Sequence, residues 1–408
     1  MPQRAADERA ADSDFTVGLV LPGGGARAAY QVGVLRAIAE LLPDGDNPFP
    51  VIVGTSAGAV SASVLATEAF RWRTAIAALE QVWANFRVDQ VFRADAISVL
   101  RAGLRWSAAL YSGGLLRPPL ALLDNTPLRE LLRARIRWPL LRQSVRRGAL
   151  RALAICATGY DNGTSVAFFD GGDHLDAWNR IHRIGRRERL GLEHLMASMS
   201  VPFLFPPVSI DGAYYGDGAQ RQLWPLSPAI HLGADRLLII GVRAPEQAAA
   251  RPPQSALGAP TAGQLFGYML DTLFMDQIFA NLEHVARLNQ FAKVAPQAVP
   301  DVRKVSTLLI VPSEDLQEVA ARHVHRLPRG LRALLRIMGT RGGAGAELAS
   351  YLMFDAAFTR ELIALGRGDA LAQGEQLREF LGGDALTRTI VMPDPGLRRR
   401  AAAPARSD

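Results

Sequence analysis

Cysteine and long apolar runs are nearly missing from this sequence. Cys156 is the one cysteine in 408 residues, so no internal disulfide can form and nothing asks for an oxidising compartment. No window approaches the roughly 20 consecutive apolar residues that a membrane-spanning helix needs. The first residues, MPQRAADERAADSDF, are polar and lack the apolar core of a signal peptide. We therefore expect a cytoplasmic protein that at most contacts the inner membrane surface from outside the bilayer.

Lysine is also scarce, with two lysines against 44 arginines, and the net charge is +7. The hydrophobic fraction of 49% suffices for a large core and excludes intrinsic disorder. Residues 129–151 carry eight arginines against the single acid Glu130, so the excess charge is local. This segment, Arg129–Arg151, fits either two solvated helix faces or a patch for anionic lipid headgroups. It lacks the interleaved aromatic residues of nucleic-acid-binding modules, so we expect no nucleic acid.

Strand and helix patterns alternate in the first part of the chain, which is typical of a parallel sheet covered on both faces. We expect strands at 15–21, 51–53, 151–158, 165–170, 236–242 and 306–311. We expect helices at 26–42, 59–69, 71–86, 126–136, 264–292, 328–338, 345–366 and 369–381. The fold class is thus α/β, three-layer α/β/α with a mainly parallel central sheet, plus a C-terminal helical portion.

Composition divides the chain further. We expect a disordered leader at 1–14, a catalytic domain at 15–245, a Pro-, Gly- and Ala-rich linker or loop at 246–263, a mainly helical portion at 264–392, and a disordered basic tail at 393–408. The strand at 306–311 fits either a separate subdomain or the same sheet. Nothing in the sequence identifies an oligomer interface.

Ser56 is a candidate nucleophile. It lies in Gly54-Thr55-Ser56-Ala57-Gly58, which fits G-x-S-x-G directly after a strand and before a helix. In that context a tight turn projects the hydroxyl, small neighbours relieve crowding, and the helix N-terminus favours developing negative charge. The motif alone is common in a chain rich in alanine and glycine, so its strand–helix context carries the prediction.

A glycine-rich segment joins the first strand to its helix, about 30 residues before the serine. It reads Pro22-Gly23-Gly24-Gly25-Ala26-Arg27, and its N–H groups suit a phosphate or an oxyanion. The same segment matches the dinucleotide pattern G-x-G-x-x-A up to Ala28, which needs an acidic residue at the end of the second strand. That strand ends in Gly54-Thr55-Ser56, so the oxyanion role is favoured.

The serine needs a base, and several residues compete for this role. Asp211 and Asp217 each begin an Asp-Gly-Ala tripeptide, which is usually a turn. A Ser-His-Asp triad is the alternative, and His231 and His284 stand in a permissible order, although no histidine lies in a recognisable catalytic motif. No H-E-x-x-H pattern or cysteine cluster is present, so we expect neither a metal nor a cofactor.

Taken in order, these segments resemble the patatin-like phospholipases. That family shares a G-G-G-x-R oxyanion loop, a G-x-S-x-G nucleophile and a late D-G-[GA] aspartate, here Gly23–Arg27, Gly54–Gly58 and Asp217–Ala219. The late segment follows S-x-S-x-P and precedes a proline by eight residues, where Pro225 stands, which selects Asp217 over Asp211. The segments NTPLRELL, ATGYDNGTSVAFFD and ASYLMFDAAF extend the resemblance over roughly residues 15–370.

The resemblance implies a phospholipase A-type lipid acyl hydrolase acting on lipid or phospholipid. Ser56 would attack a fatty-acyl ester, Asp217 would take its proton, and an acyl-enzyme would form. The oxyanion hole would come from Gly23, Gly24, Gly25, Ala26 and Arg27, and the nucleophile elbow from Gly54 and Gly58.

Two positions depart from the family pattern, and two other functions stay open. Ala28 stands where glycine often follows the arginine, and Pro22 where many members carry Gly or Asp, which affects the path of the oxyanion loop. The alternatives are a Ser-His-Asp carboxylesterase of small esters and a non-catalytic lipid-binding protein on the same fold.

Overall fold

The computed structural model describes residues 15–42, 46–93, 104, 111–112, 121–244, 261–294, 304–338 and 346–382. The predicted leader 1–14, the tail 393–408 and residues 246–260 of the predicted linker lie outside them. Helix α11 (Ala262–Asp271) begins two residues before the helix predicted at 264, with Thr261 as its N-cap.

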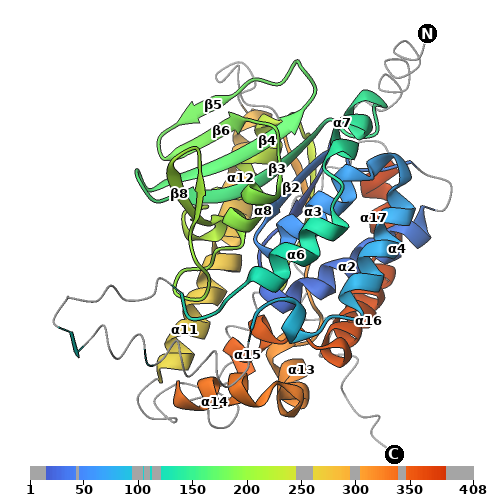
Figure 1. Ribbon diagram of the computed structural model, residues 1–408. Coiled ribbons are helices and arrows are strands. Elements are labelled where there is room, and N and C mark those ends of the chain that lie inside the picture. Colours follow the sequence, from blue (N-terminus) through green and yellow to red (C-terminus); the bar gives the residue numbers. More distant parts are fainter. Residues whose placement is uncertain are drawn as a thin grey trace, which may run out of the picture.

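A mixed sheet of ten strands, as far as the described residues go, runs through the centre of the molecule (Figure 1). Its parallel half consists of β10 (Ser306–Ile310), β9 (Arg236–Ile240), β1 (Val17–Leu21), β2 (Val51–Thr55) and β3 (Ala152–Gly159), in this spatial order. The α/β class and the parallel centre are thus confirmed. The strand expected at 306–311 forms the edge of this same sheet, beside β9.

Antiparallel pairing begins at β3. Strand β4 (Thr164–Gly171) follows the turn predicted at GYDNG and pairs antiparallel with β3. Farther out, β6 (Arg183–Arg187) pairs parallel with β4, and β5 (Trp178–Arg180) pairs antiparallel with β6. The hairpin β7 (Val208–Ile210) and β8 (Ala213–Asp217) joins the far end of β3. Strand β4 is the one expected at 165–170. The short strands β5, β6, β7 and β8 carry no long apolar run, so the sequence patterns did not predict them.

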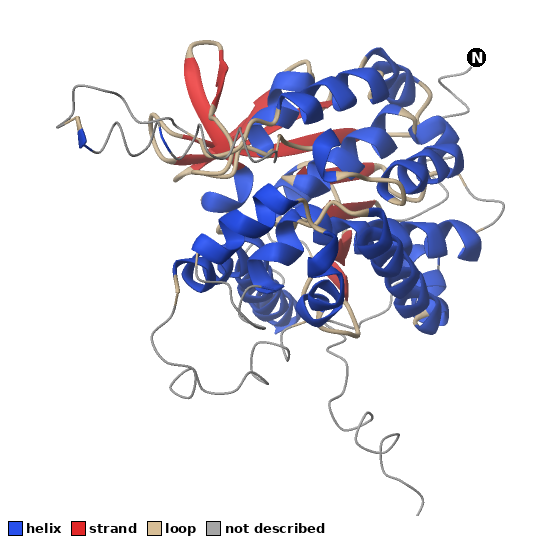
Figure 2. Cartoon of the chain, turned by 60° about the horizontal axis from the view of Figure 1, so that its bottom comes forward, coloured by secondary structure: helices blue, strands red, loops and turns tan. Residues whose placement is uncertain are grey.

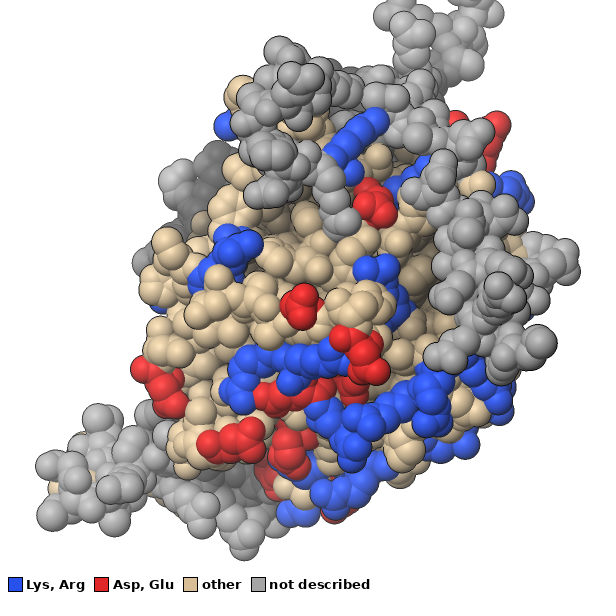
Figure 3. All heavy atoms as spheres, turned by 90° about the horizontal axis from the view of Figure 1, so that it is seen from above, with Lys and Arg blue, Asp and Glu red and all other residues tan. Residues whose placement is uncertain are grey.

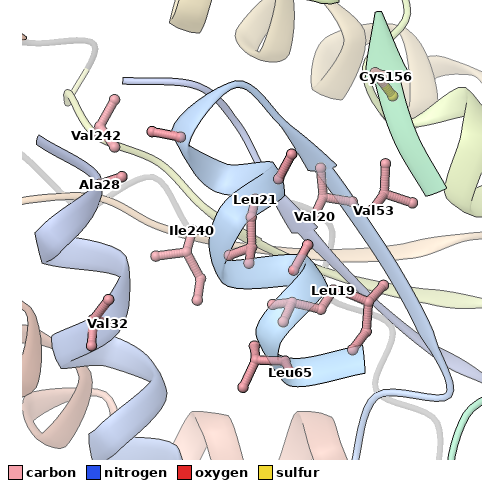
Figure 4. Packing of buried hydrophobic residues seen from close by; sticks show 14 of the residues in the cluster. Leu19, Val20, Leu21, Ala28, Val32, Val53, Leu65, Cys156, Ile240 and Val242 are labelled. Carbon is pink, nitrogen blue, oxygen red and sulfur yellow. The ribbon is translucent and has the colours of Figure 1, made fainter. Parts of the chain in front are cut away.

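Helices cover both faces of the parallel half because β1 points alternate side chains to opposite sides. Leu19 and Leu21 face α3 (Ala57–Thr67), and Figure 4 shows them in one apolar layer with Leu65 of that helix. On the other face, a Cβ placed at Gly18 would lie 2.8 Å from Ala234 Cβ, just after the short helix α9 (Ser227–His231). The predicted three-layer arrangement is confirmed, with α12 (Gln277–Val294) on this second side (Figure 1).

Further helices pack outside α3 and around the end of the sheet that carries the glycine loop (Figures 1 and 2). Those on the α3 side are α2 (Ala29–Leu41), α4 (Trp72–Trp83), α6 (Thr126–Arg135), α7 (Pro139–Arg146), α16 (Ala356–Ala372) and α17 (Gly374–Gly382). The remaining described helices of the chain are α8 (Leu192–Ser198), α13 (Leu316–His323), α14 (Arg329–Ile337) and α15 (Ala346–Leu352).

The helices predicted at 345–366 and 369–381 are divided at the wrong place, since α16 continues through residues 367 and 368 to Ala372. The helix predicted at 345–366 is interrupted at Met353 and Phe354. Asp355 then caps α16 by accepting a hydrogen bond from Ala357 N at 3.0 Å. The helical pattern continues because Met353 and Phe354 are apolar and buried, so the hydrophobic spacing hides the interruption. The helix predicted at 264–292 likewise contains a π-helical turn, Thr272–Asp276.

Helices α2 and α16 cross at unusually short range. A Cβ at Gly33 would lie 2.0 Å from Ile363 O, and a Cβ at Gly366 would lie 2.2 Å from Tyr30 O. Each glycine therefore admits the backbone of the other helix, which anchors the C-terminal helical portion to the first helix of the fold.

We expect Gly33→Ala to lower the free energy of unfolding by roughly 3 kcal/mol, because the two backbones must separate to admit the methyl group. Gly368→Ala is the matched control, since its Cβ would meet nothing within 4 Å, and alanine should stabilise α16 by up to about 1 kcal/mol. Urea unfolding of both variants measures this. Equal stability of Gly33→Ala and wild type would contradict the close crossing.

Candidate functional site

Ser56 occupies a strained turn between β2 and α3. Its backbone has φ +52° and ψ −128°, a region that side-chain-bearing residues rarely adopt, and it is the N-cap of α3. A Cβ at Gly58 would lie 2.2 Å from Leu21 O, and a Cβ at Gly54 would lie 2.5 Å from Ala59 Cα. The two glycines of G-x-S-x-G therefore let this turn fit against β1 and the start of its own helix.

Ser198 holds the backbone of Ser56. The Ser56 N–H donates to Ser198 Oγ at 2.9 Å, and Ser198 Oγ donates to Cys156 O at 2.6 Å on the neighbouring strand β3. Ser198 is fully buried at the end of α8. The sequence offered only the S-x-S-x-P resemblance as a signal for this residue, and its contact with Ser56 requires the tertiary fold.

Asp217 ends β8 beside the serine. Its N–H donates to Ser200 O at 2.9 Å, and its Oδ1 accepts a hydrogen bond from Ala219 N at 2.9 Å. The side chain is buried, and Oδ2 meets no donor at full hydrogen-bond geometry among the described residues. Burial raises the pKa of Asp217 to about 7, although the Ser56 hydroxyl and the Ala219 N–H both lower it. This carboxyl can therefore exchange a proton near neutral pH.

Asp211, the competing aspartate, forms the turn of the β7–β8 hairpin. It has φ +50°, followed by φ +84° at Gly212, and its side chain is 77% exposed next to Arg186. Two residues with positive φ are typical of a tight hairpin turn. The two Asp-Gly-Ala tripeptides thus occupy different environments, and Asp217 is the one that lies with Ser56.

The glycine loop lies against the serine. A Cβ at Gly23 would be 3.0 Å from Ser56 Cβ, and a Cβ at Gly25, which has φ +52°, would be 2.3 Å from Tyr351 O. The loop then enters a short 3-10 helix, Gly25–Ala28, whose first N–H groups have no partner within the helix. Arg27 differs from the sequence expectation, because its N–H donates to Gly24 O at 3.0 Å and so closes the turn.

The Arg27 side chain points away from the serine into a buried polar cluster. Its Nη1 donates to Asp271 Oδ1 at 2.9 Å and to the Tyr351 hydroxyl at 3.0 Å, and its Nε donates to Ser350 Oγ at 2.7 Å. Arg243 Nη1 approaches the other carboxylate oxygen of Asp271 at 3.0 Å. The sequence did not predict these partners, since they lie more than 200 positions from Arg27 in the chain.

An apolar cavity opens beside Ser56. Gly25 and Ser56 form one part of its wall, and Tyr351 adds an aromatic ring. The other lining residues are apolar: Ala57, Val60, Trp83, Phe86, Val91, Leu128, Met199, Val201, Leu204, Phe205, Leu270, Phe274, Leu352 and Phe354. A cavity of this lining suits a hydrocarbon chain, with the serine hydroxyl as its polar end.

Other titratable groups lie elsewhere. None of the seven histidines, all within the described ranges, lines this cavity. His231 stacks on Trp178 and His284 packs edge-on against Trp224. Burial raises the pKa of Cys156 to about 12, so this thiol stays protonated. Among the described residues, no three His, Cys, Asp or Glu side chains gather as metal ligands.

The basic segment Arg129–Arg151 forms α6 and α7. Leu128 of α6 lines the cavity, whereas α7 leads into Ala152, at the end of the sheet opposite Ser56. Arg129 pairs with Glu193, and Arg137 Nη2 lies 2.6 Å from Glu68 Oε1. Figure 3 shows arginines next to acidic side chains on the face seen from above. None of the described helices is both long enough and apolar enough to cross a membrane.

Comparisons with known proteins identify the family of this chain. The family model described as "Patatin-like phospholipase" matches residues 19–230. Among solved structures, the crystal structure of VipD from Legionella pneumophila matches with a TM-score of 0.29 and 14% identity, covering 86% of this chain and 67% of that chain. No curated protein matches. Because the family match spans more than half of the 408 residues, this chain belongs to the patatin-like phospholipase family.

Proposed function

We propose that this protein is a serine hydrolase of lipid fatty-acyl esters, of phospholipase A type, with Ser56 as nucleophile and Asp217 as base. One observation carries the proposal: the strained serine lies beside a buried carboxylate with an unpartnered oxygen, at the wall of an apolar cavity. Family membership supports a lipid substrate. The ester class and the dyad are our inference from the geometry.

In the first half of the reaction, Asp217 Oδ2 accepts the Ser56 proton as Oγ attacks the ester carbonyl carbon. The carbonyl π electrons move to the oxygen, and the N–H groups of Gly24, Gly25 and Ala26 stabilise that oxyanion together with the N-terminus of α3. The C–O bond then breaks, the alcohol leaves with the proton from Asp217, and the acyl group stays on Ser56.

In the second half, water replaces the alcohol. Asp217 takes a proton from the water as its oxygen attacks the acyl carbon, and the same N–H groups hold the oxyanion. The bond to Ser56 Oγ breaks, Oγ regains the proton, and the fatty acid leaves. The pKa of about 7 suits Asp217 to both proton transfers near neutral pH.

The carboxylesterase alternative requires a histidine next to Ser56, and no histidine among the described residues lines that cavity. The non-catalytic alternative leaves the strained backbone of Ser56 and the burial of the Asp217 carboxylate without a purpose. Both features have a cost in stability, which favours a catalytic role.

We also propose that the substrate is met at a membrane surface, where exposed arginines of α6, in the segment Arg129–Arg151, contact anionic headgroups. The exposed arginines of α6 that are nearest in sequence to Leu128, a residue of the cavity wall, are Arg133 and Arg135. Each such residue adds about 1 kcal/mol near a charged leaflet. A cytoplasmic location on the inner membrane surface would suit this contact.

A lipid-panel hydrolysis assay tests the function. We expect wild type to release fatty acid, and Ser56→Ala and Asp217→Asn each to lower turnover by at least about 1000-fold, since nucleophile and base act as a unit. Because Asp217 must be ionised, activity should rise with pH through about 7 and then level off. Hydrolysis of the same lipid in neutral and in anionic vesicles tests the proposed membrane contact.

Control variants separate the alternatives in the same assay. Asp211→Asn, His231→Ala and His284→Ala should each keep activity within about twofold, because exposed or distant groups take no part in the proton transfer. Loss of activity with a single histidine would favour the triad. A wild type that a fluorophosphonate probe fails to label at Ser56 would favour the non-catalytic alternative.

The burial of Asp217 also predicts an effect on stability. The folded-state pKa of about 7 exceeds the ordinary 3.8, so the folded state binds an extra proton between these values. Its stability therefore falls as pH rises from 4 to 7. Asp217→Asn should remove this cost and raise the free energy of unfolding by up to roughly 4 kcal/mol at pH 8, but little at pH 4. Urea unfolding at both pH values measures it, and equal gains would contradict the prediction.

The cavity predicts acyl-chain preference. Phe354 packs 5.6 Å from Phe86 and 6.3 Å from Trp83 between ring centroids, and all three line the cavity. Phe354→Leu should lengthen the space and raise kcat/KM for long chains relative to short ones by about tenfold. Phe92→Leu is the control, because Phe92 contacts Phe354 without lining the cavity. A series of p-nitrophenyl esters of rising chain length measures it, and equal ratios for both variants would refute this assignment.

A further inference from the structure

The glycine loop carries no side chain that could hold it in place before Arg27. The positions of Gly23, Gly24 and Gly25 depend on the residues that pack against them. These residues include Phe274 and Tyr351 from the C-terminal part of the chain. The Phe274 ring lies 2.4 Å from the Cβ position of Gly23, and Tyr351 O lies 2.3 Å from that of Gly25. Both residues lie outside the matched segment 19–230.

Asp271 connects these contacts. Its Oδ1 accepts hydrogen bonds from Arg27 Nη1 and from the Tyr351 hydroxyl, and its Oδ2 pairs with Arg243. One carboxylate therefore links the loop, α11, α15 and the segment after β9.

The carboxylate is held in its charged form. Asp271 has no solvent exposure, and burial alone would raise its pKa. Arg27, the hydrogen bond from the Tyr351 hydroxyl and Arg243 outweigh that effect, so the pKa of Asp271 lies well below its ordinary value. A permanent charge facing Arg27 fixes the guanidinium, which also lies 3.9 Å from the Tyr351 ring centroid.

The backbone next to Asp271 has an unusual conformation. Helix α11 ends at Asp271, and the π-helical turn Thr272–Asp276 follows at once. π-helical turns are rare and occur often at functional sites. This one supplies Phe274 to the loop and to the cavity wall, so Asp271 and Phe274 contact the same loop from one helix end.

We propose that Asp271 is a positioning residue for the reaction, which through Arg27 holds the N–H groups of Gly24, Gly25 and Ala26 at the oxyanion. Asp271 does not line the cavity, so it acts without touching the substrate. This role rests on the proposed function. Oxyanion donors must lie within a few tenths of an ångström of their place, and a displacement of about 1 Å costs on the order of 100-fold in rate.

Asp271→Asn tests the role, because the amide keeps the size of the carboxyl and removes its charge. On a soluble p-nitrophenyl ester we expect kcat to fall about 10- to 100-fold with KM within about twofold, since the donors act on the transition state. The midpoint of the pH–activity profile should stay at the wild-type value, because it belongs to Asp217. A merely structural defect would lower the active fraction and leave kcat per labelled Ser56 unchanged.

Asp276→Asn is the matched control. Asp276 lies five residues on, is 40% exposed and pairs with Arg243 Nη2 at 2.6 Å without contacting Arg27. Its replacement should leave kcat unchanged. A folded Asp271→Asn enzyme with kcat within twofold of wild type would overturn the proposal.

Ser350→Ala provides a second route if Asp271→Asn does not fold. It removes the acceptor of Arg27 Nε and lies outside the cavity wall, so kcat should fall several-fold at constant KM. Unchanged kcat in that variant would also overturn the role. If wild type neither hydrolyses the ester nor reacts with a fluorophosphonate at Ser56, the proposed function itself is refuted. If wild type is active and the Asp271→Asn variant is unaffected, only the role of Asp271 is refuted.

Discussion

Close backbone contact around Ser56 is the constraint on which the rest of the site depends. A Cβ at Gly58 would lie 2.2 Å from Leu21 O, and one at Gly25 would lie 2.3 Å from Tyr351 O, distances that real Cβ atoms do not show. A Cβ at Gly23 would lie 2.4 Å from the Phe274 ring and 3.0 Å from Ser56 Cβ. A methyl group at any of these positions would push a strand, a helix or the oxyanion loop away from the others. The strained backbone of Ser56 persists because these contacts hold it from several sides.

The site also concentrates polar groups that are costly to bury. Asp217 is kept from water and carries an unpartnered oxygen, so its carboxylate is less stable than in solvent. The cluster around Asp271 solves the opposite problem, since two guanidinium groups and a hydroxyl satisfy one charge. The first arrangement suits a group that exchanges protons, and the second suits one that never does.

Two parts of the chain therefore meet at the reaction centre. The segment that matches the family, residues 19–230, contains Ser56, Asp217 and the glycine loop. Helices α11 and α15 contribute Asp271 and Ser350, which bind Arg27 of that loop. Helix α15 and the π-helical turn contribute Tyr351 and Phe274, which pack on the loop and line the cavity. The crossing of α2 and α16 at Gly33 and Gly366 joins the same two parts a second time.

The sequence by itself determined the α/β class, the buried strands of the parallel half and the candidates Ser56, Asp217 and Gly23–Gly25, because apolar runs and glycine motifs act locally. It could not separate Asp217 from Asp211 without a family resemblance, since both read as Asp-Gly turns. Only the tertiary structure decided that Arg27 faces Asp271, that Ser198 holds Ser56, and that α15 and α16 part at Met353 and Phe354. Those outcomes depend on contacts between residues far apart in the chain, which no local pattern records.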